Sequence, residues 1–390
     1  VASRLEAPSV EIPMNRHHPS AANLVRRSAV AAVALAGLSV ALPAVAETSS
    51  WSTRSSDATP PTKAEQKPAK ALPKPSSKPD AKAPGKEQAA KPAGNSSTHL
   101  KTAPAIGGDD EAYHAFDQGR YLTALELAER RAALGDATAH TLIGRIFAEG
   151  LGVPQNLQTA ANAYMRGAEL GDTEAQLAYG LMLVQGKGVG KDPAEGGVWL
   201  EKAAASGHPQ ANYNLGLLFL TGNGKPENPH RAAAHIRYAA EKGIAAAQYD
   251  VGTLYQKGEG VPHDAAEAAR WIRRAANQGL AEAELEYAVL LLRGLGLTED
   301  EPNAIQYLRK AAEKNMAVAQ NRLAHVYAEG IGVDRSAVEA AKWRLIAKAG
   351  GQPEDPALDK LVASLSKSDR AKAEQAATEW REKSQVQLLE

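Results

Sequence analysis

The chain has 390 residues, no cysteine, and 45 basic and 45 acidic residues. The lack of cysteine excludes disulfides and thiolate metal sites. The charge is unevenly spread, because residues 51–106 carry ten Lys or Arg against four Asp or Glu, whereas residues 107–390 carry 31 against 38. This mildly acidic C-terminal part argues against a phosphate-binding surface, so we expect no nucleic-acid partner.

Residues 1–46 are typical of a secretory signal peptide, with Met14 as a candidate start of translation. Basic residues precede an apolar run at 29–42, and the small residues Ala44 and Ala46 flank Val45 ahead of a cleavage point at Glu47. The basic residues are Arg16, Arg26 and Arg27. The alternative is an uncleaved inner-membrane anchor, since a span of ~20 residues can cross a bilayer. We expect export, to the periplasm or beyond, after cleavage.

Residues 47–106 are rich in Pro, Ala, Lys and Ser and nearly devoid of large apolar side chains. Such a composition cannot bury enough surface to offset the entropy of ordering, so we expect a disordered linker. Lysines recur every three or four residues from Lys63 to Lys86. They suit a soluble spacer, or weak contact with anionic envelope polymers or a membrane surface.

Beyond residue 136 the sequence repeats every 36 residues, which indicates a helical solenoid. One register of small residues is Gly144, Gly180, Gly216, Gly252, Ala288 and Ala324. Another closes each unit at Gly171, Gly207, Gly243, Gly279, Asn315 and Gly351. We therefore expect six repeats over 137–352, each made of two short helices joined by a Gly-rich loop.

The stretch 245–280 illustrates the unit. Its first helix should end at Gly258, and Asp264 should cap the second helix, with Glu267 completing a capping box. Small residues such as Gly252 should allow the two helices to cross closely. The second helix should bury Trp271.

The pattern A-x-A-x-x-x-L-G-x-x-Y-x-x-G-x-G-V-x-x-D closely resembles the Sel1-like repeat (SLR) family, a relative of tetratricopeptide repeats. The resemblance covers six copies within 137–351. It implies an all-α fold, a right-handed α/α solenoid whose first helices line a concave groove. Repeats three and five depart from the pattern only locally, with Lys225 and Leu297 at the loop Val.

The remaining parts of 107–390 should cap the solenoid at both ends. Residues 109–136 predict a half-cap with a short turn at 119–121. Residues 356–384 predict capping helices, in which Ser368 begins the last helix and Trp380 covers the core.

No pattern predicts catalysis, a cofactor or a metal site. The one Ser-x-x-Lys, from Ser364 to Lys367, lacks the accompanying motifs of penicillin-recognising enzymes. The ten histidines are scattered, and the two Glu-x-x-His matches, at Glu111 and Glu227, lie far apart along the array. His235 stands where other repeats place Trp or Tyr, which favours a core role.

The first helices of repeats two, three and five are apolar almost all round, which indicates either burial or a ligand-binding surface. In families that this chain resembles, the fifth, ninth and twelfth positions point into the groove. The predicted groove residues are Leu177, Leu181, Val184, Tyr213, Leu217, Leu220, Tyr249, Leu285, Val289 and Leu292. Stacking between neighbouring first helices could instead consume these side chains, and the sequence leaves both interpretations open.

These features predict a non-enzymatic interaction scaffold or regulator in the cell envelope, whose groove binds a protein or peptide partner. The resemblance brings one rival, a hydrolase activity attributed to some secreted Cys-rich members, which the lack of cysteine and of a triad disfavours. A third interpretation is an envelope-attached structural protein that acts through its Lys-rich linker.

Overall fold

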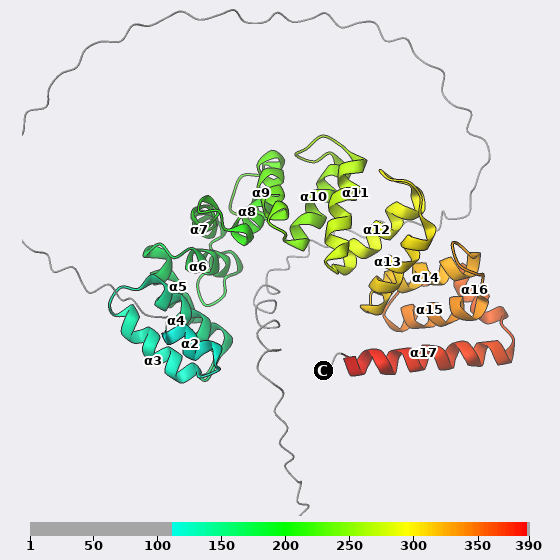
Figure 1. Cartoon of the computed structure of the whole chain (residues 1–390), viewed down its shortest axis with the longest axis horizontal. Helices are drawn as coiled ribbons and strands as arrows, with labels where there is room; N and C mark the ends of the chain where they lie inside the picture. The colour runs from blue at the N-terminus through cyan, green and yellow to red at the C-terminus, as the bar shows by residue number, and fades with distance from the viewer. Residues whose placement is uncertain (1–110, 388–390) are drawn as a thin grey trace, which may run out of the picture. The chain divides into compact units, whose positions relative to one another are not determined.

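The computed structural model describes residues 111–387, with side chains to Ser384. In this part of the chain the regular elements are sixteen α-helices, and there is no strand (Figure 1). The predicted signal peptide and linker lie outside the described residues. None of the helices described between 111 and 387 is long and apolar enough to span a membrane.

The helices follow one another in pairs, as the 36-residue period predicts. The first helices of the six repeats are α4 (Ala137–Glu149), α6 (Thr173–Gln185), α8 (Pro209–Thr221), α10 (Ala245–Lys257), α12 (Ala281–Arg293) and α14 (Ala317–Glu329). The second helices are α5 (Leu157–Glu169), α7 (Pro193–Ala205), α9 (Pro229–Glu241), α11 (Ala265–Asn277), α13 (Glu301–Glu313) and α15 (Ala337–Ala349). The end helices are α2 (Glu111–Asp117), α3 (Tyr121–Ala132), α16 (Pro356–Ser364) and α17 (Lys367–Gln387).

Side-chain caps set where the second helices begin. The Asp264 carboxylate accepts hydrogen bonds from the amides of Ala266 and Glu267, at 3.0 and 2.9 Å. The predicted capping box is only half formed, because the amide of Asp264 donates to the Tyr255 carbonyl instead. The Glu267 carboxylate turns to Arg270. The sequence pattern therefore identified the cap correctly but was wrong about the reciprocal bond.

Two glycine positions explain why the helices pack so closely. A Cβ placed on Gly252 would lie 2.6 Å from Cγ1 of Ile272, so a small residue is needed where the two helices of a repeat cross. A Cβ on Gly260 would lie 2.0 Å from the carbonyl oxygen of Pro229 in the preceding repeat. Gly260 also has a φ of +70°, which side chains rarely adopt. The loop glycine thus brings neighbouring repeats into backbone contact.

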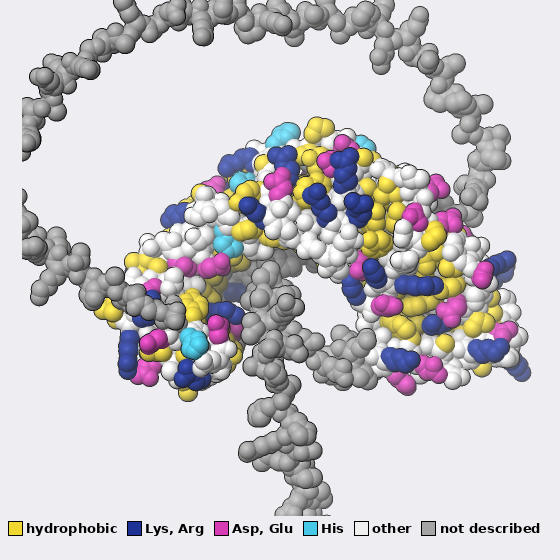
Figure 2. Space-filling view, in the orientation of Figure 1, with side chains coloured by type: hydrophobic (Ala, Val, Ile, Leu, Met, Phe, Trp, Pro, Cys, Tyr) yellow, Lys and Arg dark blue, Asp and Glu magenta, His cyan; other side chains and the backbone are white. Residues whose placement is uncertain are grey.

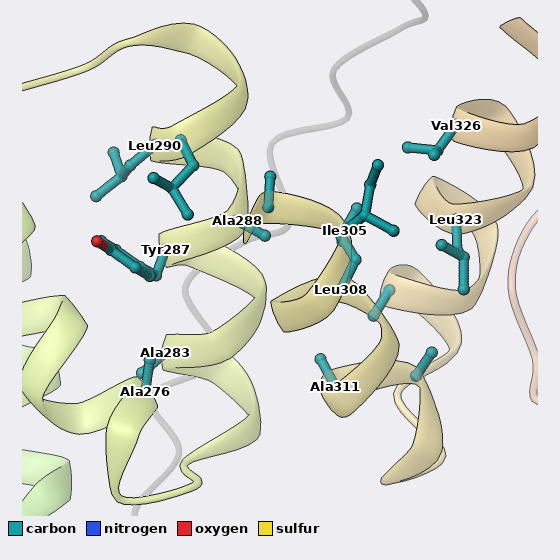
Figure 3. Packing of buried hydrophobic residues seen from close by; sticks show 14 of the residues in the cluster. Ala276, Ala283, Tyr287, Ala288, Leu290, Ile305, Leu308, Ala311, Leu323 and Val326 are labelled. Carbon is teal, nitrogen blue, oxygen red and sulfur yellow. The ribbon is translucent and has the colours of Figure 1, made fainter. Parts of the chain in front are cut away.

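The core is a row of small and branched side chains that continues from one repeat to the next. Figure 3 shows part of its largest cluster, in which Tyr287 and Leu290 of α12, Ile305 and Leu308 of α13, and Leu323 of α14 lie between the helices. Alanine fills many of the remaining core positions, including Ala283, Ala288 and Ala311. These small side chains allow close helix packing across the whole array.

A buried polar ladder runs beside this core. Gln248 Nε2 donates to the carbonyl oxygen of Ala240 at 3.1 Å, and the equivalent Gln176 and Gln320 donate to the preceding second helix in the same way. Each bond gives a second partner to a carbonyl near a helix C-terminus, which also accepts a backbone amide from just beyond the helix. Repeat five has Glu284 at this position, and Lys314 Nζ donates to it at 2.7 Å.

The end helices cover the exposed ends of the core. The helices α2 and α3 are joined by the short turn that the sequence predicts. At the other end, the rings of Trp380 and Trp343 meet edge to face, with centroids 5.8 Å apart. The prediction that Ser368 begins the last helix was wrong. Helix α17 begins at Lys367, and Ser366 Oγ accepts from the Asp369 amide.

We predict that Gly260→Ala destabilises the fold more than Gly243→Ala does. Gly243 has a φ of +94° but no atom within 4 Å of an added Cβ, so both variants meet backbone strain and only Gly260→Ala meets a clash. The difference in the free energy of unfolding should be about 1–3 kcal/mol, the usual cost of overpacking. Denaturation followed by far-UV circular dichroism measures it, and equal losses would contradict a close approach between repeats.

Candidate functional site: the first-helix face

The ten predicted groove residues all lie on first helices of repeats two to five. We call the surface formed by the fifth, sixth, ninth and twelfth residues of α6, α8, α10 and α12 the first-helix face. Eight of the ten predicted residues are half-buried on it. Val184 and Val289 are buried, at 6% and 8% exposure, so they contribute to packing more than to the accessible surface.

Contacts between repeats use part of this apolar row. Leu177 and Leu181 pack against the cluster that contains Leu200 and Leu215, in the second helix of their own repeat and the first helix of the next. Tyr213, Leu217 and Leu220 pack in the same way against a cluster formed by the second helix of repeat three and both helices of repeat four. Stacking between repeats therefore uses part of these side chains and leaves them half-buried, and their role in binding a ligand stays a prediction.

Tyr249, Leu285 and Leu292 complete the row. They are half-buried and pack against the large cluster shown in part in Figure 3. The apolar row is thus present in repeats two and three and again in repeat five. In repeat four, Thr253 and Gln256 occupy the ninth and twelfth positions, so the row is interrupted there.

Two hydrogen bonds join adjacent first helices across this interruption. Tyr213 Oη of α8 donates to Asp250 Oδ2 of α10 at 2.8 Å. Gln256 Nε2 of α10 donates to Glu286 Oε1 of α12 at 3.0 Å. Asp250 and Glu286 are not among the groove residues predicted from the sequence. Their signal is the sixth repeat position, which is acidic only in repeats four and five.

Burial dominates the electrostatics of this polar region. It raises the pKa of Asp250, while the bond from Tyr213 and the charge of Lys257 act in the opposite direction. Burial likewise raises the pKa of Tyr249 to about 12, with further increases from the charges of Glu286, Asp250 and Glu282. The first-helix face therefore has a partly desolvated acidic centre between two apolar parts.

The row ends at repeat six in a buried ionic network. Arg344 of α15 is 1% exposed and donates through Nε and Nη2 to the two carboxylate oxygens of Asp359, at 2.8 and 2.9 Å. Its Nη1 also donates to Asn321 Oδ1 at 3.0 Å. Asn321 and His325 both contact Asp355, which caps α16. These contacts fix the C-terminal cap to the array.

Outside the first-helix face, the candidate chemical groups have structural roles. Among residues 111–384, no group of three or more His, Cys, Asp or Glu side chains could hold a metal ion. Ser364 Oγ is exposed and donates to the Leu361 carbonyl oxygen. His235 stacks on Phe219, with ring centroids 5.8 Å apart. His230 contacts the carbonyl oxygen of Gly260.

A hollow of about 380 Å³ lies at the C-terminal end of α11, lined in part by Glu284, Lys310 and Glu313. Lys314 also lines it and donates to both the Gly279 carbonyl and Glu284 Oε1, at 2.7 Å each. The pair of Lys314 and Glu284 thus stands in repeat five where repeats two, four and six have the glutamine of the ladder. The hollow therefore belongs to the packing between repeats.

Comparison with known proteins identifies the repeat. A family model described as the Sel1 repeat matches six consecutive stretches, residues 137–172, 173–208, 209–244, 245–280, 281–316 and 317–351. The chain belongs to the Sel1 repeat family. The predicted family and the predicted α/α solenoid are both confirmed. Sel1 repeats are typically scaffolds for protein–protein interaction and are generally non-catalytic.

Solved structures of other Sel1 repeat proteins resemble this chain. A Sel1 repeat protein from Oxalobacter formigenes is 28% identical, with a TM-score of 0.55, and the match covers 64% of this chain and 99% of that one. The protective antigen c5321 of uropathogenic Escherichia coli, which displays an SLR fold, is 25% identical, with a TM-score of 0.48 and coverage of 70% and 68%. No curated protein matches the chain.

We predict that Asp250→Asn raises the free energy of unfolding at pH 7. Burial raises the pKa of folded Asp250 above the ordinary value of 3.8, so ionisation of this group destabilises the folded chain at neutral pH. The asparagine oxygen can still accept the bond from Tyr213. The increase in the free energy of unfolding should be absent below pH 3.8. It should develop as the pH rises through the raised pKa of Asp250 in the folded chain.

Denaturant titrations of both chains from pH 3 to pH 8 test this expectation. The exposed loop residue Asp334 provides the control, because Asp334→Asn should leave stability nearly unchanged at each pH. A gain from Asp250→Asn that does not vary with pH would contradict the assignment of a desolvated carboxylate.

Proposed function

We propose that this protein is an exported, non-enzymatic scaffold of the cell envelope, and that its first-helix face binds a peptide or protein segment. The main observation in support of this proposal is the half-buried row of Leu and Tyr side chains on α6, α8 and α12. Side chains that are apolar and incompletely covered favour association with a partner that completes their burial. The sequence of residues 1–46 supports export.

The repeat architecture supports this function in a second way. A solenoid presents side chains from successive repeats on one extended surface, so a single partner segment can contact several repeats. Leu181, Leu217 and Leu292 come from three different repeats of the first-helix face. Each can contribute only modest apolar burial, so a specific interface needs contacts from several repeats at once.

We predict that the triple variant Leu181→Gln, Leu217→Gln and Leu292→Gln loses partner binding and keeps its helical content. Removing three half-buried apolar contacts should weaken binding by at least about 100-fold, at about 1 kcal/mol or more per contact. A photo-crosslinking residue placed at Thr253, at the centre of the face, should form a discrete adduct in the native envelope. That adduct should disappear in the triple variant.

A matched control replaces three leucines that lie off this face. Leu122, Leu134 and Leu170 are 62%, 75% and 52% exposed, so their change to Gln should preserve the adduct. Circular dichroism and thermal melting of both triples test that the fold is kept. An adduct that survives the face variant, in a folded protein, would refute the proposed binding surface.

The Lys-rich linker offers the rival explanation, in which the protein acts by contact with an anionic envelope component. Deletion of residues 51–106 separates the two explanations. The crosslinked adduct should persist in the deletion variant if the first-helix face binds the partner, and its loss would favour the linker.

A further inference from the structure

The acidic centre of the first-helix face defines the chemistry of its partner, and this inference rests on the function proposed above. We propose that the face binds an extended peptide segment that has a lysine or arginine at its centre and apolar side chains on both sides. The central cation would lie among Asp250, Glu282 and Glu286, beside the ring of Tyr249.

The charges around Tyr249 are predominantly negative. After burial, the charges of Glu286, Asp250 and Glu282 all raise the pKa of Tyr249. Asp250 follows Tyr249 directly on α10, and Glu282 and Glu286 lie one turn apart on α12. Lys257 is the cation that acts on Asp250.

Both acceptor groups on the sixth positions retain capacity for a further bond. The hydrogen bond from Tyr213 uses Oδ2 of Asp250, and the one from Gln256 uses Oε1 of Glu286. An ionised carboxylate accepts several hydrogen bonds through its two oxygens. Tyr213 and Gln256 therefore orient the two carboxylates while leaving them able to bind a cation from a partner.

A lysine or arginine gains more from this centre than another side chain does. It forms charge-assisted hydrogen bonds with the carboxylates, and the ring of Tyr249 adds a cation–π contact. A central Asp or Glu would meet like charges, and an apolar side chain would cover charged groups without pairing them. For the same reason, a polyanion or an anionic lipid surface fits this face poorly.

The apolar parts of the face set the sequence on either side of the cation. Leu217 and Leu220 of α8 lie on one side of α10, and Leu285 and Leu292 of α12 lie on the other. The hydrogen bonds from Tyr213 to Asp250 and from Gln256 to Glu286 link α10 to both α8 and α12 on this face. A partner segment with apolar side chains on both sides of a central cation therefore matches the face.

The charges on second helices differ from this centre. Arg270, Arg273 and Arg274 of α11 are exposed, and Figure 2 shows basic side chains gathered over the α10–α11 part of the visible surface. Because opposite charges lie on different surfaces of the same repeat, a basic partner segment is directed towards the first helices and away from the second.

Peptide selection on the intact chain tests this chemistry. The probe is a phage-displayed library of random nine-residue peptides, selected at low salt on the full-length protein. A second selection uses the variant Asp250→Asn, Glu282→Gln and Glu286→Gln, whose amide oxygens can still accept the bonds from Tyr213 and Gln256. The control variant is Asp334→Asn, Glu354→Gln and Glu379→Gln, three exposed acids that lie off the face.

We expect the wild-type and control chains to enrich peptides with a central Lys or Arg and an apolar residue on each side. The acid-face variant should lose the basic preference and keep the apolar one. A synthetic wild-type-selected peptide should bind that variant at least about tenfold more weakly. Its affinity for the wild-type chain should fall as salt rises, because salt screens the charges.

Two outcomes would overturn the inference, and they are distinguishable. The first outcome is selection of apolar peptides with a neutral or acidic centre, whose binding is abolished by Leu217→Gln. This result would support binding at the first-helix face and refute the proposal that the partner has a basic centre. Enriched peptides whose binding is unaffected by Leu181→Gln, Leu217→Gln and Leu292→Gln would refute the proposed function and the partner chemistry together.

Discussion

The contact between the loop of one repeat and the backbone of the preceding repeat determines how the rest of the array is built. Gly260 lies so close to Pro229 that no side chain fits between them. Equivalent glycines make the same approach at Gly188, Gly224 and Gly296, against Leu157, Pro193 and Ala265. Because each repeat is fixed directly to its neighbour, first helices lie beside first helices, and residues 36 positions apart come onto one surface.

This arrangement explains why function is located in deviations from the repeat. Consensus positions hold the fold, as Gly252 and Trp271 do. The fifth, sixth, ninth and twelfth positions vary between repeats and so differentiate the first-helix face along its length. Repeat four matches the repeat pattern most fully. Its Asp250 and Gln256 also place polar groups between the apolar parts of the face.

Local features were predictable from the sequence, and contacts between repeats were harder to predict. Period, glycines and the Asp264 cap are encoded within one unit, so the family and the solenoid followed from the sequence. Asp250 was missed because a polar residue opposite a clear apolar stripe normally faces solvent, and its partner Tyr213 is 37 residues away. Arg344 was unpredictable for the same reason, since Asp359 and Asn321 come from other helices. The ten predicted residues all lie on first helices, but Val184 and Val289 are buried, because contacts with neighbouring helices cover their side chains.

The central claim is that a partner segment is bound by the first helices of repeats two to five. Hydrogen–deuterium exchange of the full-length chain, with and without the native partner or a selected peptide, tests this claim most directly. We expect slowed exchange in α6, α8, α10 and α12, with α11 and the inter-helix loops unchanged. Protection confined to second helices, to the loops or to residues 51–106 would contradict it.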